Sequence, residues 1–186
     1  DMDINALNSV ISIASSLSPY ISTVVCSIDN SGQKHFKYSS DDAIIQYRQE
    51  QMQDGDPNLR DILLSIVYQC ELADIFFEDI LVLEPYYLSR STESIKRLIQ
   101  SYQTSSAPVA LFKSHLKMHV WHETKNKLIR IDSFELKRDI QEKIIMSPRG
   151  LGMITSISNL RSPEWLDNDV EFVDIKDFNE AIPYRP

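Results

Sequence analysis

Glycine is scarce in this chain, with four residues among 186, where average usage would give about three times as many. Loops that cradle phosphate groups need glycine so that backbone N–H groups can approach the anion. Gly32 and Gly55 stand alone, and only the stretch Arg-Gly-Leu-Gly at 149–152 brings two glycines together. We interpret this pair as a helix end and a turn into the next strand, not as a nucleotide-binding loop.

Cysteines and long apolar runs are also few. Cys26 and Cys70 each lie in an apolar stretch, which is typical of buried thiols and argues against a disulfide scaffold. No apolar run reaches the length that crosses a bilayer, and the first residues lack the basic segment of a secretory signal. We therefore expect an intracellular protein, cytoplasmic or nuclear, with no membrane span in this chain.

Basic residues are outnumbered, because 19 Lys and Arg stand against 27 Asp and Glu and give a formal net charge of −8. Binding to a phosphate backbone requires clustered Lys and Arg that displace counterions. Nucleic acid is therefore not expected as the main partner. We interpret the basic residues between 113 and 130 as a solvated face, and these are Lys113, Lys117, Lys125, Lys127 and Arg130.

The order of predicted elements indicates the fold class. Apolar residues at helical spacing predict a helix over 3–18, which packs on a sheet or mediates dimerisation, and a β-branched run followed by Asp-Asn-Ser-Gly predicts a hairpin over 21–38. Further helices are expected over 41–53, 57–70, 92–102 and 133–146, with N-caps at Asp56 for the second and at Ser91 or Thr92 for the third. Further strands are expected over 80–83, 109–121, 127–132, 153–158 and 170–175. This order predicts an α+β fold, with a mainly antiparallel sheet covered by helices on one face, in a single domain of residues 1–186.

Three histidines lie close together in the sequence, at His115, His119 and His122. On a helix they would share one face and could hold zinc. The residues around them alternate between apolar and polar, which predicts a half-buried strand instead. On a strand, His115 and His119 lie about 13 Å apart on the solvent face, and His122 points to the opposite side. Direct chelation by all three is excluded, so a metal site would need His115 or His119 together with groups such as Asp132 from neighbouring strands.

An acidic and aromatic segment at 76–87 supplies the candidate interaction residues. No nucleophile elbow, His-Glu-x-x-His or Cys-x-x-Cys motif occurs in the sequence, so no catalytic constellation is predicted. Aromatic side chains beside carboxylates can anchor a protein partner, although tyrosines at the end of a strand are also common in half-buried core. The candidates are Phe76, Phe77, Glu78, Asp79, Tyr86 and Tyr87.

The leading hypothesis is therefore a non-enzymatic interaction module, such as an adaptor or regulatory subunit, that works in a homo- or hetero-oligomer with protein partners and without a cofactor. One alternative is a metal-dependent enzyme that uses His115 and His119. A second alternative is a small-ligand sensor with a cavity between helices and sheet, because a ligand pocket and a packed core use the same apolar residues.

Overall fold

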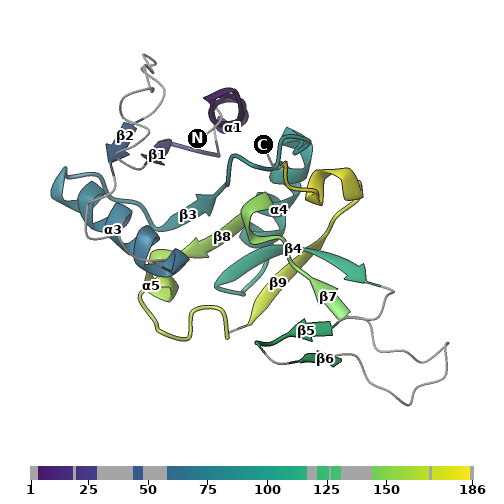
Figure 1. Ribbon diagram of the computed structural model, residues 1–186. Coiled ribbons are helices and arrows are strands. Elements are labelled where there is room, and N and C mark those ends of the chain that lie inside the picture. The colour runs from purple at the N-terminus through teal and green to yellow at the C-terminus, as the bar shows by residue number, and fades with distance from the viewer. Residues whose placement is uncertain are drawn as a thin grey trace.

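The computed structural model describes residues 4–18, 20–28, 44–47, 58–116, 121–125, 127–130, 144–167 and 169–184. The helices in these ranges are α1 (Ile4–Ser16), α3 (Leu59–Leu72), α4 (Thr92–Thr104) and α5 (Ile157–Leu160), with short 3-10 helices η2 (Arg149–Leu151) and η3 (Phe178–Ala181). The strands are β1 (Val25–Ile28), β2 (Ile44–Tyr47), β3 (Asp79–Val82), β4 (Val109–Leu116), β5 (Trp121–Glu123), β6 (Leu128–Arg130), β7 (Ile144–Met146), β8 (Met153–Ser156) and β9 (Val170–Asp174). Figure 1 shows their arrangement.

A mixed five-stranded sheet organises the molecule. Strand β8 lies between β3 and β4 and is antiparallel to both, β7 is antiparallel to β4, and β9 is parallel to β4. Strands β3, β4 and β9 therefore run in one direction and end at the same edge, which we call the carboxyl edge. The α+β expectation is broadly confirmed, but a mainly antiparallel sheet describes it imprecisely, because the pairing of β4 with β9 is parallel.

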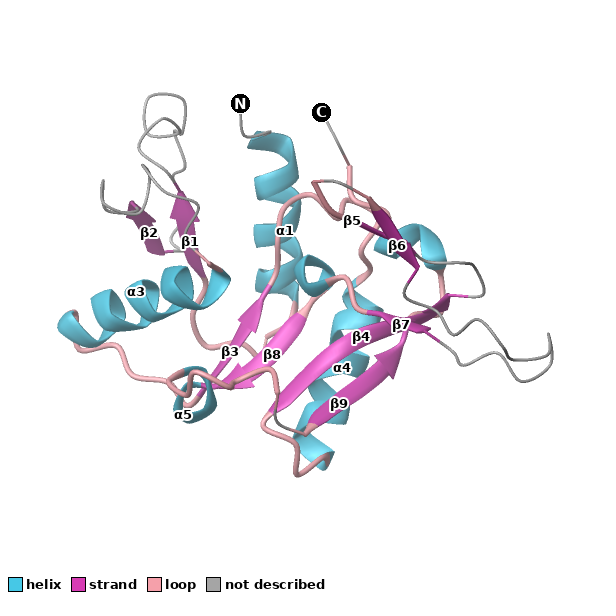
Figure 2. Cartoon of the chain, turned by 60° about the horizontal axis from the view of Figure 1, so that its bottom comes forward, coloured by secondary structure: helices cyan, strands magenta, loops and turns pink. Residues whose placement is uncertain are grey.

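Helices cover both faces of this sheet. Alternate residues of a strand point to opposite faces, and in β4 Ala110 and Phe112 belong to one core cluster whereas Val109 and Leu111 belong to another. The first cluster contains apolar residues of α4, and the second contains those of α3 and α5. Figure 2 shows α4 behind the central strands. The prediction that helices cover one face is therefore wrong, because β4 is buried on both sides.

Several sequence predictions are confirmed at this level. Helix α1 lies within the predicted range 3–18, β8 and β9 lie within predicted strands, and β3 overlaps the strand predicted over 80–83. Ser91 caps α4, because its side chain accepts a hydrogen bond from the backbone N–H of Ser94 (3.1 Å). Cys26 and Cys70 are both buried and form no disulfide. The strand predicted over 127–132 contains β6, which pairs with β5. The single strand predicted over 109–121 is wrong at its end, because Trp121 begins β5 in the sheet with β6, whereas β4 pairs with β7, β8 and β9.

Other predictions are corrected. The helix expected over 41–53 is wrong at Ile44–Tyr47, which is strand β2 and pairs in parallel with β1. The return strand of the hairpin predicted over 21–38 lies outside the described residues. The helix expected over 133–146 is wrong at Ile144–Met146, which pairs with β4, and its earlier part lies outside the described residues. Helix α3 is capped by Asn58 and not by Asp56, because the Asn58 side chain accepts from the N–H of Asp61 at 3.0 Å.

In the part of the chain that the structure describes, no helix combines the length and the apolar character needed to cross a membrane.

Gly152 lies where the sheet packs closely against α4. A Cβ atom there would meet Phe112 Cε2 at 2.9 Å, Leu98 Cδ2 at 3.1 Å and Ile95 Cδ1 at 3.2 Å. All three side chains are fully buried, so they have little room to move. We expect Gly152→Ala to lower the free energy of unfolding by about 1–3 kcal/mol through overpacking, as measured by urea denaturation. Ser106→Ala, in an exposed loop position, is the control and should leave it within about 0.5 kcal/mol; equal stability of the two variants would contradict this packing.

Candidate functional site

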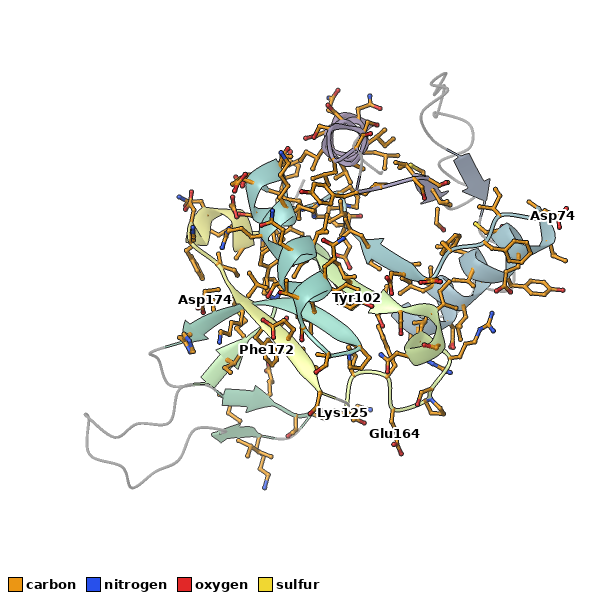
Figure 3. All side chains as sticks on the ribbon, turned by 180° about the vertical axis from the view of Figure 1, so that it is seen from behind. Asp74, Tyr102, Lys125, Glu164, Phe172 and Asp174 are labelled. Carbon is orange, nitrogen blue, oxygen red and sulfur yellow. The ribbon has the colours of Figure 1, made fainter. Side chains whose placement is uncertain are left out.

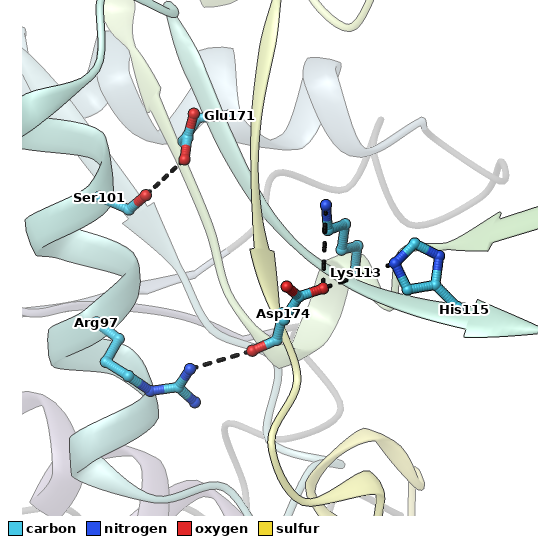
Figure 4. Close-up of polar contacts among 6 residues, drawn as sticks. All are labelled: Arg97, Ser101, Lys113, His115, Glu171 and Asp174. Atoms are coloured by element: carbon cyan, nitrogen blue, oxygen red, sulfur yellow. Dashed lines mark hydrogen bonds and ion pairs between the residues drawn. The ribbon is translucent and has the colours of Figure 1, made fainter. Parts of the chain in front are cut away.

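A basic cluster lies at the carboxyl edge, where β4 and β9 end side by side. Lys113 and Asp174 are paired in register, and His115 follows two residues later on the same side of β4. Lys113 Nζ and His115 Nε2 lie 3.9 Å and 3.8 Å from the same oxygen, Oδ1 of Asp174. From α4, Arg97 Nη1 donates to the backbone carbonyl of Asp174 at 3.1 Å. Figure 4 shows these three basic side chains around Asp174, and together the four residues form the basic cluster.

The pairing inside the basic cluster is loose. Both distances to the Asp174 carboxylate exceed hydrogen-bond length, and the Lys113, His115 and Asp174 side chains are 24%, 36% and 70% exposed. Exposed pairs of this kind contribute at most about 1 kcal/mol. Arg97 Nη2 donates to Ser94 Oγ at 3.0 Å. Among the described residues, no carboxylate lies within 4.0 Å of the Arg97 guanidinium. One carboxylate therefore faces two cations and a protonatable histidine, and the cluster can bind an anion such as phosphate.

A buried hydrogen-bonded chain fixes the helix that carries Arg97. Ser94 Oγ accepts from Arg97 and from Ser91 Oγ (3.1 Å) and donates to Glu180 Oε2 at 2.6 Å. Ser94 and Glu180 are both buried. The chain ties η3 to the first turn of α4, so the guanidinium of Arg97 is held at the carboxyl edge.

The predicted interaction residues of segment 76–79 differ in burial and in their contacts. Phe76 is 73% exposed, whereas Phe77 is half-buried and packs against the cluster that contains α3. Glu78 is exposed and the backbone carbonyl of Glu78 accepts from the N–H of Ile157 at 2.8 Å. Asp79 accepts from the hydroxyl of Tyr102 at 2.6 Å, and burial, together with Asp79, raises the pKa of that phenol. An interaction role for these residues stays a prediction.

The two tyrosines of the same segment also separate. Tyr86 is exposed, and its backbone carbonyl accepts from the N–H of Tyr184 at 2.7 Å. Tyr87 is half-buried against the core cluster that contains α4. Both tyrosines lie on the loop that follows β3, at the carboxyl edge, whereas Phe76 precedes β3. The two tyrosines and Phe76 are therefore at opposite ends of this strand.

The histidines are divided between different parts of the fold. His115 belongs to the basic cluster, His119 lies outside the described residues, and His122 is in β5, paired with Ile129. Within the described ranges, no three His, Cys, Asp or Glu side chains gather in a way that could hold a metal ion. Metal binding by His115 and His119 is therefore not tested. His115 shares the Asp174 carboxylate with the ammonium group of Lys113. This positive charge disfavours binding of a divalent metal ion beside His115.

Burial makes Cys26 a poor candidate nucleophile. Desolvation raises the pKa of its thiol to about 11, and the thiolate is the reactive form.

Sequence reasoning missed most of the basic cluster. Lys113 was assigned to a solvated face, and neither Arg97 nor Asp174 was a candidate. One sequence feature could have indicated this site, namely the uninterrupted apolar run from 109 to 112 followed by charged residues. Such a run is typical of a strand buried on both faces of a sheet, and in open α/β sheets ligands bind at the carboxyl ends of the strands.

Fold and edge together define a protein of helices and strands with an open mixed sheet, helices on both faces and charged residues at the carboxyl edge. No family model matches the sequence, and no curated protein matches it. Solved structures do share the fold. One is a 4-diphosphocytidyl-2C-methyl-D-erythritol synthase, with a TM-score of 0.63 and 11% identity over 97% of this chain and 84% of that one. Another is the 4-diphosphocytidyl-2C-methyl-D-erythritol synthase of Anaerococcus prevotii DSM 20548, with a TM-score of 0.60 and 12% identity over 94% of this chain and 78% of that one.

These matches contradict the leading hypothesis from the sequence. The chain shares the fold of a synthase along nearly its whole length, so its interpretation as a non-enzymatic adaptor or regulatory subunit is wrong. The protein partners, the oligomeric state, the domain boundaries 1–186 and the intracellular location stay predictions.

The Asp174 carboxylate should limit anion binding at the basic cluster. Asp174→Asn removes the negative charge beside Lys113 and His115, so we expect inorganic phosphate to bind about two- to fivefold more tightly, while the melting temperature without phosphate changes little because the pairs are exposed. Isothermal titration calorimetry measures the affinity. Asp169→Asn makes the same charge change at another exposed position and should bind phosphate like the original protein. Weaker phosphate binding in Asp174→Asn than in Asp169→Asn would contradict the role given to the cluster.

Proposed function

We propose that the chain is an enzyme of the nucleotidyl-transfer type, which binds the phosphate groups of a nucleotide at the carboxyl edge. The observation that carries this proposal is the position of Lys113 and His115, at the end of the central parallel strand of a fold shared with two synthases whose product name contains a diphosphocytidyl group. In open α/β sheets, ligands bind outside the carboxyl ends of the strands.

The chemistry of nucleotidyl transfer suits the groups at this edge. An acceptor oxygen forms a bond to the α-phosphorus of a nucleoside triphosphate while the bond from that phosphorus to pyrophosphate breaks. Positioning and electrostatic stabilisation of the phosphate oxygens supply most of the catalysis. Lys113 and Arg97 would hold these oxygens, and His115 in its protonated form, stabilised by Asp174, would add a positive charge beside an acceptor phosphate, whose oxygen attacks the α-phosphorus with no proton to remove.

Lys113→Ala should lower the rate of pyrophosphate release. The protein is incubated with magnesium, each common nucleoside triphosphate and a panel of phosphorylated polyols, beginning with cytidine triphosphate because of the names of the similar structures. Loss of one charged contact to a phosphate predicts a fall in kcat/KM of about 10- to 100-fold, since each factor of ten is about 1.4 kcal/mol.

Lys125→Ala is the matched control, because it removes the same charge from an exposed lysine that lies apart from Asp174 (Figure 3). Its kcat/KM should equal that of the unchanged protein. Absence of pyrophosphate release with every nucleotide and acceptor would overturn the proposal, and equal activity of Lys113→Ala and Lys125→Ala would remove Lys113 from the site.

A further inference from the structure

A second cationic group, Arg90, is buried near the end of β3. Arg90 is only 4% exposed. Its Nη2 donates to the backbone carbonyls of Glu84 at 2.6 Å and of Gly150 at 2.7 Å, and the N–H of Glu84 also donates to the Gly150 carbonyl at 2.9 Å. These contacts hold the guanidinium between the loop that follows β3 and the 3-10 helix that precedes β8.

The other donor atoms of Arg90 are buried without an acceptor. Nε and Nη1 have no hydrogen-bond partner among the described residues, and no carboxylate of those residues lies within 4.0 Å of the guanidinium. Glu84 and Glu180 are the nearby carboxylates, and Glu180 accepts from Ser94. A buried charged donor left without an acceptor costs more than the hydrogen bond it could form contributes.

Arg90 nevertheless keeps its charge at neutral pH. Desolvation lowers its pKa, while Glu84, Tyr87 and Glu180 act in the opposite direction, and the result is a pKa of about 10. The guanidinium is therefore a permanent cation, held in place and short of acceptors.

We propose that one of the unpaired donors of Arg90, Nε or Nη1, binds an oxyanion of a ligand, a phosphate or a carboxylate group, at a subsite separate from the basic cluster. The subsite lies on the loop after β3, whereas the basic cluster lies at the ends of β4 and β9, and all three strands end at the carboxyl edge. Because Nη2 is already engaged, the oxyanion accepts a single charge-assisted hydrogen bond, which a phosphate and a carboxylate can both form.

The neighbours of Arg90 indicate how the oxyanion enters. Cζ of Arg90 lies over the ring of Tyr87, 5.9 Å from the ring centroid, and Tyr87 is half-buried. Gly150 leaves the room in which the Glu84 carboxylate and the Tyr87 ring pack, since a Cβ at that position would overlap both. Two backbone carbonyls close the Nη2 side of the guanidinium, so we expect an incoming oxyanion to approach from the side of the Tyr87 ring and to displace it.

The test measures binding of inorganic phosphate and, separately, of acetate by isothermal titration calorimetry at constant ionic strength, in the Lys113→Ala background so that the basic cluster contributes less. We expect one of the two anions to bind, and its identity names the ligand group. Arg90→Lys keeps the charge but loses the N–H donors that the planar guanidinium holds in fixed directions, and we expect it to weaken that binding at least fivefold. Binding of neither anion, or equal binding in Arg90→Lys, overturns the proposal.

Tyr87→Ala and Tyr86→Ala form a matched pair that decides the question even if Arg90→Lys does not fold. Removing the ring over the guanidinium should tighten oxyanion binding about three- to tenfold, whereas the same truncation at the exposed Tyr86 should leave it unchanged. A purely structural role of Arg90 predicts equal binding by both tyrosine variants, and that result overturns the subsite. Nucleotidyl transfer is not required for this inference, so anion binding at Arg90 without pyrophosphate release would contradict the proposed function alone.

Discussion

The burial of β4 on both faces of the sheet is the constraint on which the other elements depend. The side chains from Val109 to Phe112 are at most 6% exposed, and full burial of an aliphatic or aromatic side chain contributes about 1.5–3 kcal/mol. That contribution requires α3 and α5 on one face and α4 on the other. It also requires partners for β4 on both edges, which β8 and β9 supply. Because β9 is parallel to β4, charged residues that follow the buried run meet at one edge.

The sequence predicts the elements better than their pairing. Helical spacing identifies α1, α3 and α4, and an uninterrupted apolar run identifies β3, since these signals are local. Strands β2 and β7 were assigned to helices because Ile44-Ile45 and Ile144-Ile145 are short apolar pairs with polar, helix-favouring neighbours. Periodicity cannot separate helix from strand over so few residues, and pairing with β1 and β4 decides the conformation. An uninterrupted run such as 109–112 is typical of a strand buried on both faces, but the alternation after it led to the prediction of a half-buried strand.

Long-range pairing also explains why the basic cluster was not predicted. Arg97 and Asp174 are 77 positions apart, and Arg90 and Gly150 are 60 apart. A search for compact motifs finds residues that are close in sequence, and the compact histidine group proved to be divided between β4, β5 and residues outside the described ranges. Gly150 is informative only once the Glu84 carboxylate and the Tyr87 ring are seen to occupy the space that a side chain would need. The close approach of Glu84 and Tyr87 to Gly150 cannot be predicted from residue spacing or composition.

The two cationic regions of the carboxyl edge differ in what water does to them. Lys113 and His115 are partly exposed, so water screens their attraction to Asp174 and the cluster can exchange that partner for another anion at little cost. Arg90 is shielded from water, so an acceptor that reaches it gains a strong and directional interaction, but only after a neighbouring group has moved. An exposed cluster of this kind suits attraction of a ligand, and a buried guanidinium suits its orientation. The net charge of −8 would then favour small anions over long polyanions, because the repulsion from the rest of the surface grows with the length of the ligand.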